Sequence, residues 1–255
     1  MRNIIAIAQK ELKIYFISPI AYAVFTIFLL ISGFFYYNIL MWFNLQSLQF
    51  GANPYYSSQL NINQMVYSPF FHNSSIILLL MIPLLTMRLF SEEKRLGTDE
   101  LLFTSPVTTT EIIIGKYLAS ITILFLMLLI TGMYSIFAFK YGNPQLEPIL
   151  IGYLGLFLMG SAFISIGIFT SAITESQLVA AVLGFGSLLL LWVISWLGET
   201  AGMIWKGILG YLSFFEHFDD MVKGVIDTTD LVYYLSFTFF GLFLTHIVIE
   251  AKKWK

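Results

Sequence analysis

The sequence predicts an all-α membrane protein with six transmembrane helices, an N-terminal interfacial helix and one further short helix in a cytoplasmic loop. Hydrophobic residues make up 58% of the 255 positions and charged residues only 11%, and the mean hydropathy is +0.83. Soluble domains are about 45–50% apolar and about 25% charged, so this chain has too few charged groups to cover a soluble surface. Six apolar stretches have the length of about 17–25 residues that a bilayer core requires.

The N-terminal segment 3–16 is expected to lie in the membrane interface. On a helix, its apolar and polar side chains separate onto two faces, and the polar face is basic. Ser18-Pro19 then ends the helix, because proline disfavours helical geometry at the residue before it. The alternative is that the segment is the ragged start of the first span. The two faces consist of Ile4, Ile5, Ala8, Leu12, Tyr15 and Phe16, and of Asn3, Gln9, Lys10 and Lys13.

The spans are expected in a single domain that covers residues 1–255. Residues 44–73 are polar and uncharged, and we expect an external ordered loop there. Residues 198–229 form a mixed segment with an amphipathic middle. Pro83 is expected to kink the second span. The expected spans are about 19–43, 74–90, 117–139, 149–173, 178–197 and 230–249.

Basic residues predict the orientation. If the N-terminus, segment 88–116, turn 174–177 and the C-terminus share one side, that side holds ten of the 13 basic residues. Positive residues mark the cytoplasmic side, so both ends are expected in the cytoplasm of a multi-pass inner (plasma) membrane protein. The net charge of −2 gives no sign of nucleic-acid binding.

The only long cytoplasmic loop, 91–116, is dense in charge. Ser91 could cap a short helix that Pro106 ends, and Thr108 with Glu111 forms a capping box for the third span. The loop therefore predicts a short amphipathic helix parallel to the membrane, suited to docking onto a cytoplasmic protein. The alternative is an ordinary solvated loop that carries the positive-inside charges.

This loop closely resembles the coupling region of ABC-2-type permeases, the transmembrane subunits of ATP-binding-cassette exporters. The likeness is closest to the permeases linked with gliding motility and with nitrous-oxide-reductase maturation, and it follows the whole chain in span order. The family pattern is acidic-acidic-basic, Gly-Thr-x-Glu, Leu-x-Thr-x-Pro and then Gly-Lys. The matching residues are Glu92, Glu93, Lys94, Arg95, Gly97, Thr98, Glu100, Leu102, Thr104, Pro106, Gly115 and Lys116.

The resemblance implies a mechanical role for the chain. Two such subunits, identical or related, would form the pathway, with a dimer seam at the first and fifth spans. A coupling helix at about 91–105 would insert into a groove of a separate cytoplasmic ATPase, which binds ATP and Mg²⁺. Glu92, Glu93 and Arg95 would meet charged partners there, and Gly97 would permit close backbone approach.

No residue pattern predicts catalysis or nucleotide binding by the chain itself. A P-loop needs glycine, four residues and then Gly-Lys-Ser/Thr, but Thr110 and Tyr117 stand at the required ends around Gly115-Lys116. The expected spans hold almost no ionisable residue, unlike those of ion-coupled carriers. His246 is alone in the last span and is expected to pack against a neighbour. We expect a non-catalytic subunit with no cofactor or metal of its own.

Two further patterns allow more than one interpretation. Small residues in the fourth and fifth spans favour close packing within the subunit over a substrate path. The external cluster of Glu216, His217, Asp219, Asp220, Asp227 and Asp230 could hold a cation, but Asp227 and Asp230 could instead cap the sixth span.

The leading hypothesis is therefore the permease subunit of an ATP-driven exporter. The alternative is an ATPase-coupled membrane anchor that transmits force to an extracytoplasmic assembly, without solute transport. An intramembrane enzyme is a third and weaker hypothesis, because paired catalytic groups are lacking.

Overall fold

The computed structural model describes residues 2–50, 60–98, 107–200 and 210–253, and this part of the chain is α-helical with one π-helical turn. The helices are α1 (Arg2–Ile17), α2 (Pro19–Phe50), η1 (Asn63–Tyr67), α4 (Ser68–Thr86), α5 (Arg88–Arg95), α7 (Thr109–Gly132), α8 (Ser135–Tyr141), α9 (Leu146–Ile173), α10 (Gln177–Thr200), α12 (Phe214–Val222) and α13 (Thr228–Lys253).

Six helical stretches of the described residues are long and apolar enough to cross a membrane, which confirms the predicted fold class. Several of these stretches extend beyond the expected bounds. For example, α7 begins at Thr109 and not near residue 117. They are Pro19–Gln49, Asn63–Arg95, Thr109–Tyr141, Leu146–Ile173, Gln177–Ile194 and Thr228–Lys252.

The expectation of an ordered external loop over residues 44–73 is wrong at both of its ends. Helix α2 continues to Phe50, and the chain is helical again from Asn63. Asn63 is anchored by two hydrogen bonds with the backbone of Gln145, which precedes α9. The polar composition misleads because asparagine, glutamine and serine are only modestly unfavourable in helices, and packing overrides their propensity.

Helix α9 is the centre of the bundle, because α4, α5, α7, α10, α12 and α13 all pack against it. Its glycines make this possible. A Cβ atom at Gly167 would lie 2.1 Å from the Thr86 hydroxyl of α4, and one at Gly160 would lie 2.7 Å from Leu124 of α7. These small residues serve packing within the subunit.

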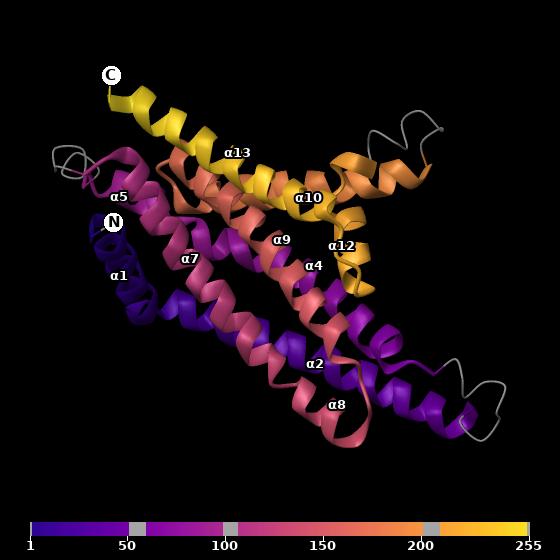
Figure 1. Ribbon diagram of the computed structural model, residues 1–255. Helices are drawn as coiled ribbons and strands as arrows, with labels where there is room; N and C mark the ends of the chain where they lie inside the picture. The colour runs from indigo at the N-terminus through magenta and orange to yellow at the C-terminus, as the bar shows by residue number, and fades with distance from the viewer. Residues whose placement is uncertain (1, 51–59, 99–106, 201–209, 254–255) are drawn as a thin grey trace.

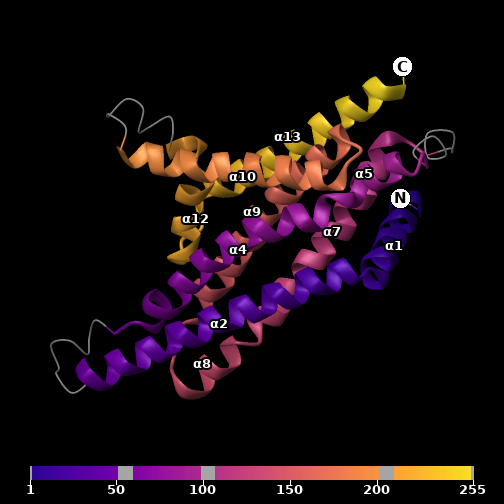
Figure 2. The same cartoon turned by 180° about the vertical axis from the view of Figure 1, so that it is seen from behind.

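The molecule has two ends that matter for the site. We call the end formed by α1, α5 and the start of α7 the α5 end; the last turns of α13 lie there too (Figure 1). At the opposite end, which we call the α8 end, lie α8, the last turns of α2 and the start of α9. Helix α2 runs between these two ends beside α4 and α7 (Figure 2).

Candidate functional site

The junction between α4 and α5 is held by one hydroxyl group of α9. Helix α4 ends at Thr86 and α5 begins at Arg88, and the N–H group of Met87 between them donates to the Pro83 carbonyl at 2.9 Å. The Ser171 hydroxyl accepts the N–H groups of Phe90 at 3.0 Å and Ser91 at 3.2 Å, and it donates to the Met87 carbonyl at 2.8 Å. Helix α5 begins at Arg88, so the expectation that Ser91 caps it is wrong.

The C-terminal end of α5 has a defined cap. Gly97 has a φ of +66°, a conformation that glycine adopts without steric cost. Its N–H group donates to the Lys94 carbonyl and that of Thr98 donates to the Glu93 carbonyl, so the last carbonyl groups of α5 are satisfied. The Lys94 ammonium group donates to the carbonyl of Ala172 at the end of α9.

A buried lysine joins α5 to two other helices. Lys116 of α7 is 1% exposed, and its ammonium group lies 2.9 Å from a carboxylate oxygen of Glu11 in α1 and 2.9 Å from one of Glu93 in α5. It also donates to the Leu89 carbonyl at 2.6 Å and lies over the Phe90 ring. A buried charge is tolerated only when it is paired, so this cluster fixes the three helices relative to one another.

Lys10 extends the cluster to its exposed rim. Its ammonium group lies 3.1 Å from Glu93 and 3.6 Å from Glu11. Partial burial lowers the pKa of Lys10, but the charges of Glu93 and Glu11 outweigh this effect, and the net pKa is raised above its usual value. We call Lys10, Glu11, Glu93 and Lys116 the charge cluster.

Tyr15 adds a neutral contact between α1 and the ends of two spans. Its hydroxyl donates to the Leu85 carbonyl at 3.0 Å and lies 3.2 Å from the Ser120 hydroxyl. The Arg88 guanidinium lies 5.0 Å from the centre of the Tyr15 ring. Burial raises the pKa of Tyr15 to about 12, so the phenol remains a hydrogen-bond donor across the physiological pH range.

Helix α1 lies directly on the start of α7. A Cβ atom at Gly115 would come within 2.8 Å of the Ile7 side chain, so only glycine permits this approach. The Asn3 amide donates to Glu111 at 3.3 Å. The predicted capping box of Thr108 and Glu111 is confirmed as the start of α7. Helix α1 is therefore tied along much of its length to the third span.

Beyond α5, the described residues leave a polar and apolar surface open at this end. Arg95, Leu96, Gly97 and Thr98 are exposed, and nothing lies within 4 Å of the position that a Cβ atom would take at Gly97. A hollow of about 810 Å³ runs from Arg95 to Glu175 in the turn before α10. We call Arg95–Thr98 and this hollow the candidate docking surface. The sequence-predicted site residues Glu100, Thr104 and Pro106 lie outside the described residues.

The comparison with known proteins identifies this arrangement. The family described as ABC-2 family transporter protein matches residues 5–250. The chain belongs to this family. It is thus the membrane permease subunit of an ABC transporter and a multi-pass membrane protein. None of the curated proteins compared with this permease matches it.

The structure of the permease brings together residues that the sequence interpretation did not connect. Glu93 and Lys94 are occupied by contacts within the chain, whereas Arg95 is exposed. Glu11 and Lys116 were missed as partners because Lys116 was placed just before a span. A signal exists: Glu11 follows Ala8 and precedes Tyr15 on the face of α1 that becomes buried, and a lone carboxylate there requires a cation.

The acidic cluster before the sixth span of the permease divides into separate contacts. The Nδ1 atom of His217 lies 2.7 Å from Asp230, and its Nε2 atom lies 3.1 Å from the Tyr211 carbonyl. Asp230 is therefore buried against α12 and does not cap α13, whereas the predicted cap by Asp227 is confirmed, because Asp227 accepts the N–H group of Thr229. Among the described residues no three His, Cys, Asp or Glu side chains are placed to hold a metal ion.

His246 does not pack as a buried side chain. It is partly exposed on α13 and lies 3.8 Å from Glu250, one turn further along the same helix. Glu250 is therefore the neighbour that the His246 side chain meets on this helix.

Proposed function

We propose that this permease couples ATP hydrolysis by a separate cytoplasmic ATPase subunit to export across the inner membrane. The observation that carries the proposal is the α5 end, where the exposed candidate docking surface is joined through the buried charge cluster to α1 and α7. A displacement of α5 by a docked ATPase would move Glu93, and Lys116 would pass this movement to the first turns of the third span.

In this proposal the permease works as a dimer, with N- and C-termini in the cytoplasm. Helices α2 and α10 support a dimer, because each exposes large apolar side chains, including Phe34 and Leu30 on α2 and Val182 and Leu190 on α10. Gly186 of α10 also has open space beside it. ATP and Mg²⁺ would bind to the partner subunit, and this chain would carry no cofactor of its own.

The motility-type anchor is the second candidate function, and the external connection that it would use is shorter than expected. Helix α2 extends to Phe50 and η1 begins at Asn63, so the connection available to hold an external protein is shorter than the sequence suggested. Reconstituted vesicles distinguish the two functions. ATP-dependent movement of a solute supports export, whereas ATP turnover with no solute movement supports the anchor.

The test of coupling uses two substitutions on the docking surface. The chain is purified with a co-expressed ATPase subunit, and ATP hydrolysis of the complex is compared with that of the ATPase subunit alone. We expect Arg95→Glu and Gly97→Val to abolish the difference while membrane insertion persists, because charge and backbone direction change only at the docking surface. Gly132→Ala is the control, since Gly132 is in α7 and has open space beside it. Normal coupling in both docking variants would refute the proposal.

A further inference from the structure

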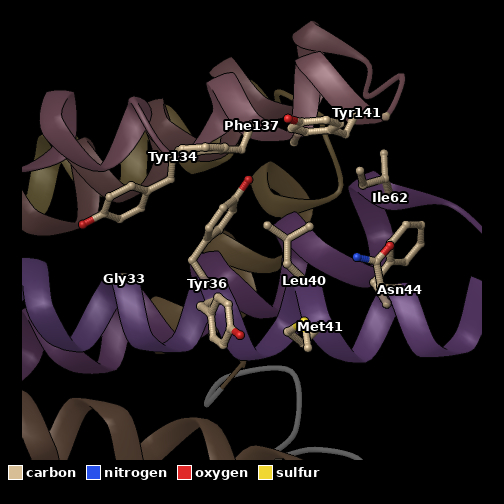
Figure 3. Close-up of a pocket in the computed structure, with 13 residues that line it drawn as sticks. Gly33, Tyr36, Leu40, Met41, Asn44, Ile62, Tyr134, Phe137 and Tyr141 are labelled. Atoms are coloured by element: carbon tan, nitrogen blue, oxygen red, sulfur yellow. The ribbon is translucent and has the colours of Figure 1, made fainter.

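An elongated cavity of about 520 Å³ lies at the α8 end, between α2 and α8. Figure 3 shows its two walls: Tyr134, Phe137 and Tyr141 follow one another along one helix, and Tyr36, Leu40 and Asn44 follow one another along the other. We call this cavity the trough. Its volume lies in the range of about 300–1,000 Å³ that is usual for small-molecule sites.

The trough exists because the third span changes direction. Helix α7 ends at Gly132, and the backbone then forms tighter bonds from Met133 to Ile130, from Tyr134 to Thr131 and from Ile136 to Met133. Each of these bonds joins residues three positions apart, as in a 3₁₀ turn. The axis of α8 therefore differs in direction from that of α7. The redirected helix faces α2 without packing fully against it.

Internal contacts of the chain hold the two walls of the trough in place near each of its ends. At the deep end the Tyr134 hydroxyl donates to the Leu29 carbonyl at 3.1 Å, and the rings of Tyr36 and Tyr134 lie 5.6 Å apart. At the outer end Ile62 lies so close to Gly142 that an added Cβ atom would be 2.9 Å from it. The trough is thus preformed and does not depend on a ligand to open it.

The shape of the trough follows the helical repeat. The α2 residues that line it are Gly33 and three adjacent pairs that follow at steps of three or four positions, so they form a single stripe; the pairs are Tyr36-Tyr37, Leu40-Met41 and Phe43-Asn44. The eleven helical steps from Gly33 to Asn44 span about 16 Å, which makes the trough long and narrow. A chain-like ligand fits this shape better than a globular one.

The chemistry of the trough selects an uncharged group. Its lining consists of aromatic and aliphatic side chains, three glycines or alanines and the Asn44 amide, and no charged side chain is among them. The polar groups of the exposed Tyr37, Asn44 and Tyr141 lie toward the surface of the molecule. An apolar chain could therefore fill the trough while a polar head group remained at the membrane surface.

We propose that the trough binds one apolar chain of a lipid-like amphiphile, with the head group at the outer membrane surface beside Asn44 and Tyr141. The amphiphile could come from the surrounding bilayer or be carried by the transporter, and the chemistry recognised in the trough is the same. The proposal concerns binding only, so it can fail or hold whether or not the ATPase coupling proposed above is correct.

The test places the full chain in phosphatidylcholine nanodiscs that contain a trace of phosphatidylcholine with a diazirine at the end of one acyl chain. After illumination, mass spectrometry locates the labelled peptides. We expect labelling of α8 and of the α2 stripe to exceed that of the exposed apolar face of α13. Leu40→Trp should lower labelling in the trough by roughly tenfold, because the indole occupies the space of the chain.

Leu45→Trp is the matched control, because Leu45 is on the same helix, 56% exposed and outside the trough. Met41→Trp at the trough's exposed edge provides a second blocking variant that does not require a buried side chain to be replaced. Labelling in the trough no higher than on α13, or unchanged labelling in a folded Leu40→Trp or Met41→Trp protein, would overturn the proposal.

Competition separates the two sources of the amphiphile. Monoacylglycerol, an uncharged single-chain amphiphile, is added before illumination. Loss of trough labelling at low monoacylglycerol supports an exchangeable ligand such as a transported amphiphile. Persistent labelling that Leu40→Trp still removes supports a resident bilayer lipid in the same trough.

Discussion

The two ends of the third span are joined to neighbouring helices by different forces. At the α5 end, Lys116 is buried between carboxylates of two other helices and has directional partners at 2.9 Å. At the α8 end, Tyr134 meets α2 through one hydrogen bond and ring contacts, and a trough remains beside it. Charge pairs in a low-dielectric site fix one geometry, whereas apolar walls accept different occupants.

This difference assigns distinct roles to the two ends. A contact that passes movement from one helix to another must hold the helices in a fixed position relative to one another. The charge cluster holds α1, α5 and α7 in this way. A part that binds a variable apolar chain needs shape and not directional bonds. In the two proposals, the same span responds to a motor at one end and binds a ligand at the other.

The largest expected effect comes from removing the central charge. Lys116→Met leaves the carboxylates of Glu11 and Glu93 with only the exposed Lys10 as a cation, so we expect a loss of about 3–5 kcal/mol of stability. Thermal unfolding in detergent, followed by size-exclusion chromatography, measures it.

The matched control is Lys223→Met at the outer surface of α12. The Lys223 side chain is 57% exposed and pairs with Asp219 and Asp220, so its loss should cost less than about 1 kcal/mol. Equal unfolding temperatures for the two variants would show that burial does not distinguish the two sites.

Close packing between α1 and α7 gives the next largest effect. Gly115→Leu places a side chain where Ile7 already lies, and overpacking of this kind costs about 1–3 kcal/mol. We expect α1 to separate from α7, which faster proteolysis near the N-terminus would report. Gly186→Leu on α10 meets open space and should leave α1 protected. Unchanged protection in Gly115→Leu would argue against the close contact.

The His217–Asp230 pair tests whether a single contact also holds α12 against α13. Asp230→Asn removes the carboxylate that lies 2.7 Å from the ring, so we expect α12 to loosen from α13. The effect should be smaller than that of Lys116→Met, because Tyr233 stacks on the same ring at 4.1 Å and remains. Hydrogen exchange of residues 214–222 measures the loosening, and exchange as slow as in the unchanged protein would contradict it.

The smallest effect concerns the cap of α13 and depends on pH. The N–H and hydroxyl groups of Thr229 hold the pKa of Asp227 below its usual value. The stabilisation is therefore present above the usual value of 3.8 and is lost as the pH falls through the lowered pKa. Asp227→Ala should lower the unfolding temperature at neutral pH but not in strong acid, whereas Asp227→Asn should keep the cap at both. Equal effects of Asp227→Ala at both pH values would refute this role.

The fold could be predicted from the sequence because bilayer thickness dictates the length of apolar runs. The capping box at Thr108 was also predictable, since its pattern is local. The continuation of α2 through the polar residues to Phe50 was not, because packing decides it.

The candidate site was predicted only in its local part. The short helix itself was expected over about 91–105, but α5 runs from Arg88 to Arg95 and is capped at Gly97, whose positive φ a glycine tolerates, so the expected bounds were wrong within the described residues. The charge cluster was not predicted, because Glu11, Glu93 and Lys116 are far apart in the chain and their contacts depend on how three helices meet. The contact of Asp230 with His217 was not predicted either, because the two residues are 13 positions apart, and the sequence offered only a cap or a cation ligand for Asp230.

The most direct test of the charge cluster separates stability from coupling. The double variant Lys116→Met with Glu11→Leu replaces the Lys116–Glu11 ion pair by apolar side chains, while Glu93 keeps the Lys10 ammonium at 3.1 Å, and replacements of a buried ion pair are often neutral for stability. We predict that the unfolding temperature recovers relative to Lys116→Met alone, while ATP hydrolysis by the complex stays no higher than that of the ATPase subunit alone, because α5 is no longer joined to α7. If coupling recovers together with stability, the charge cluster holds the helices in place but does not transmit their movement.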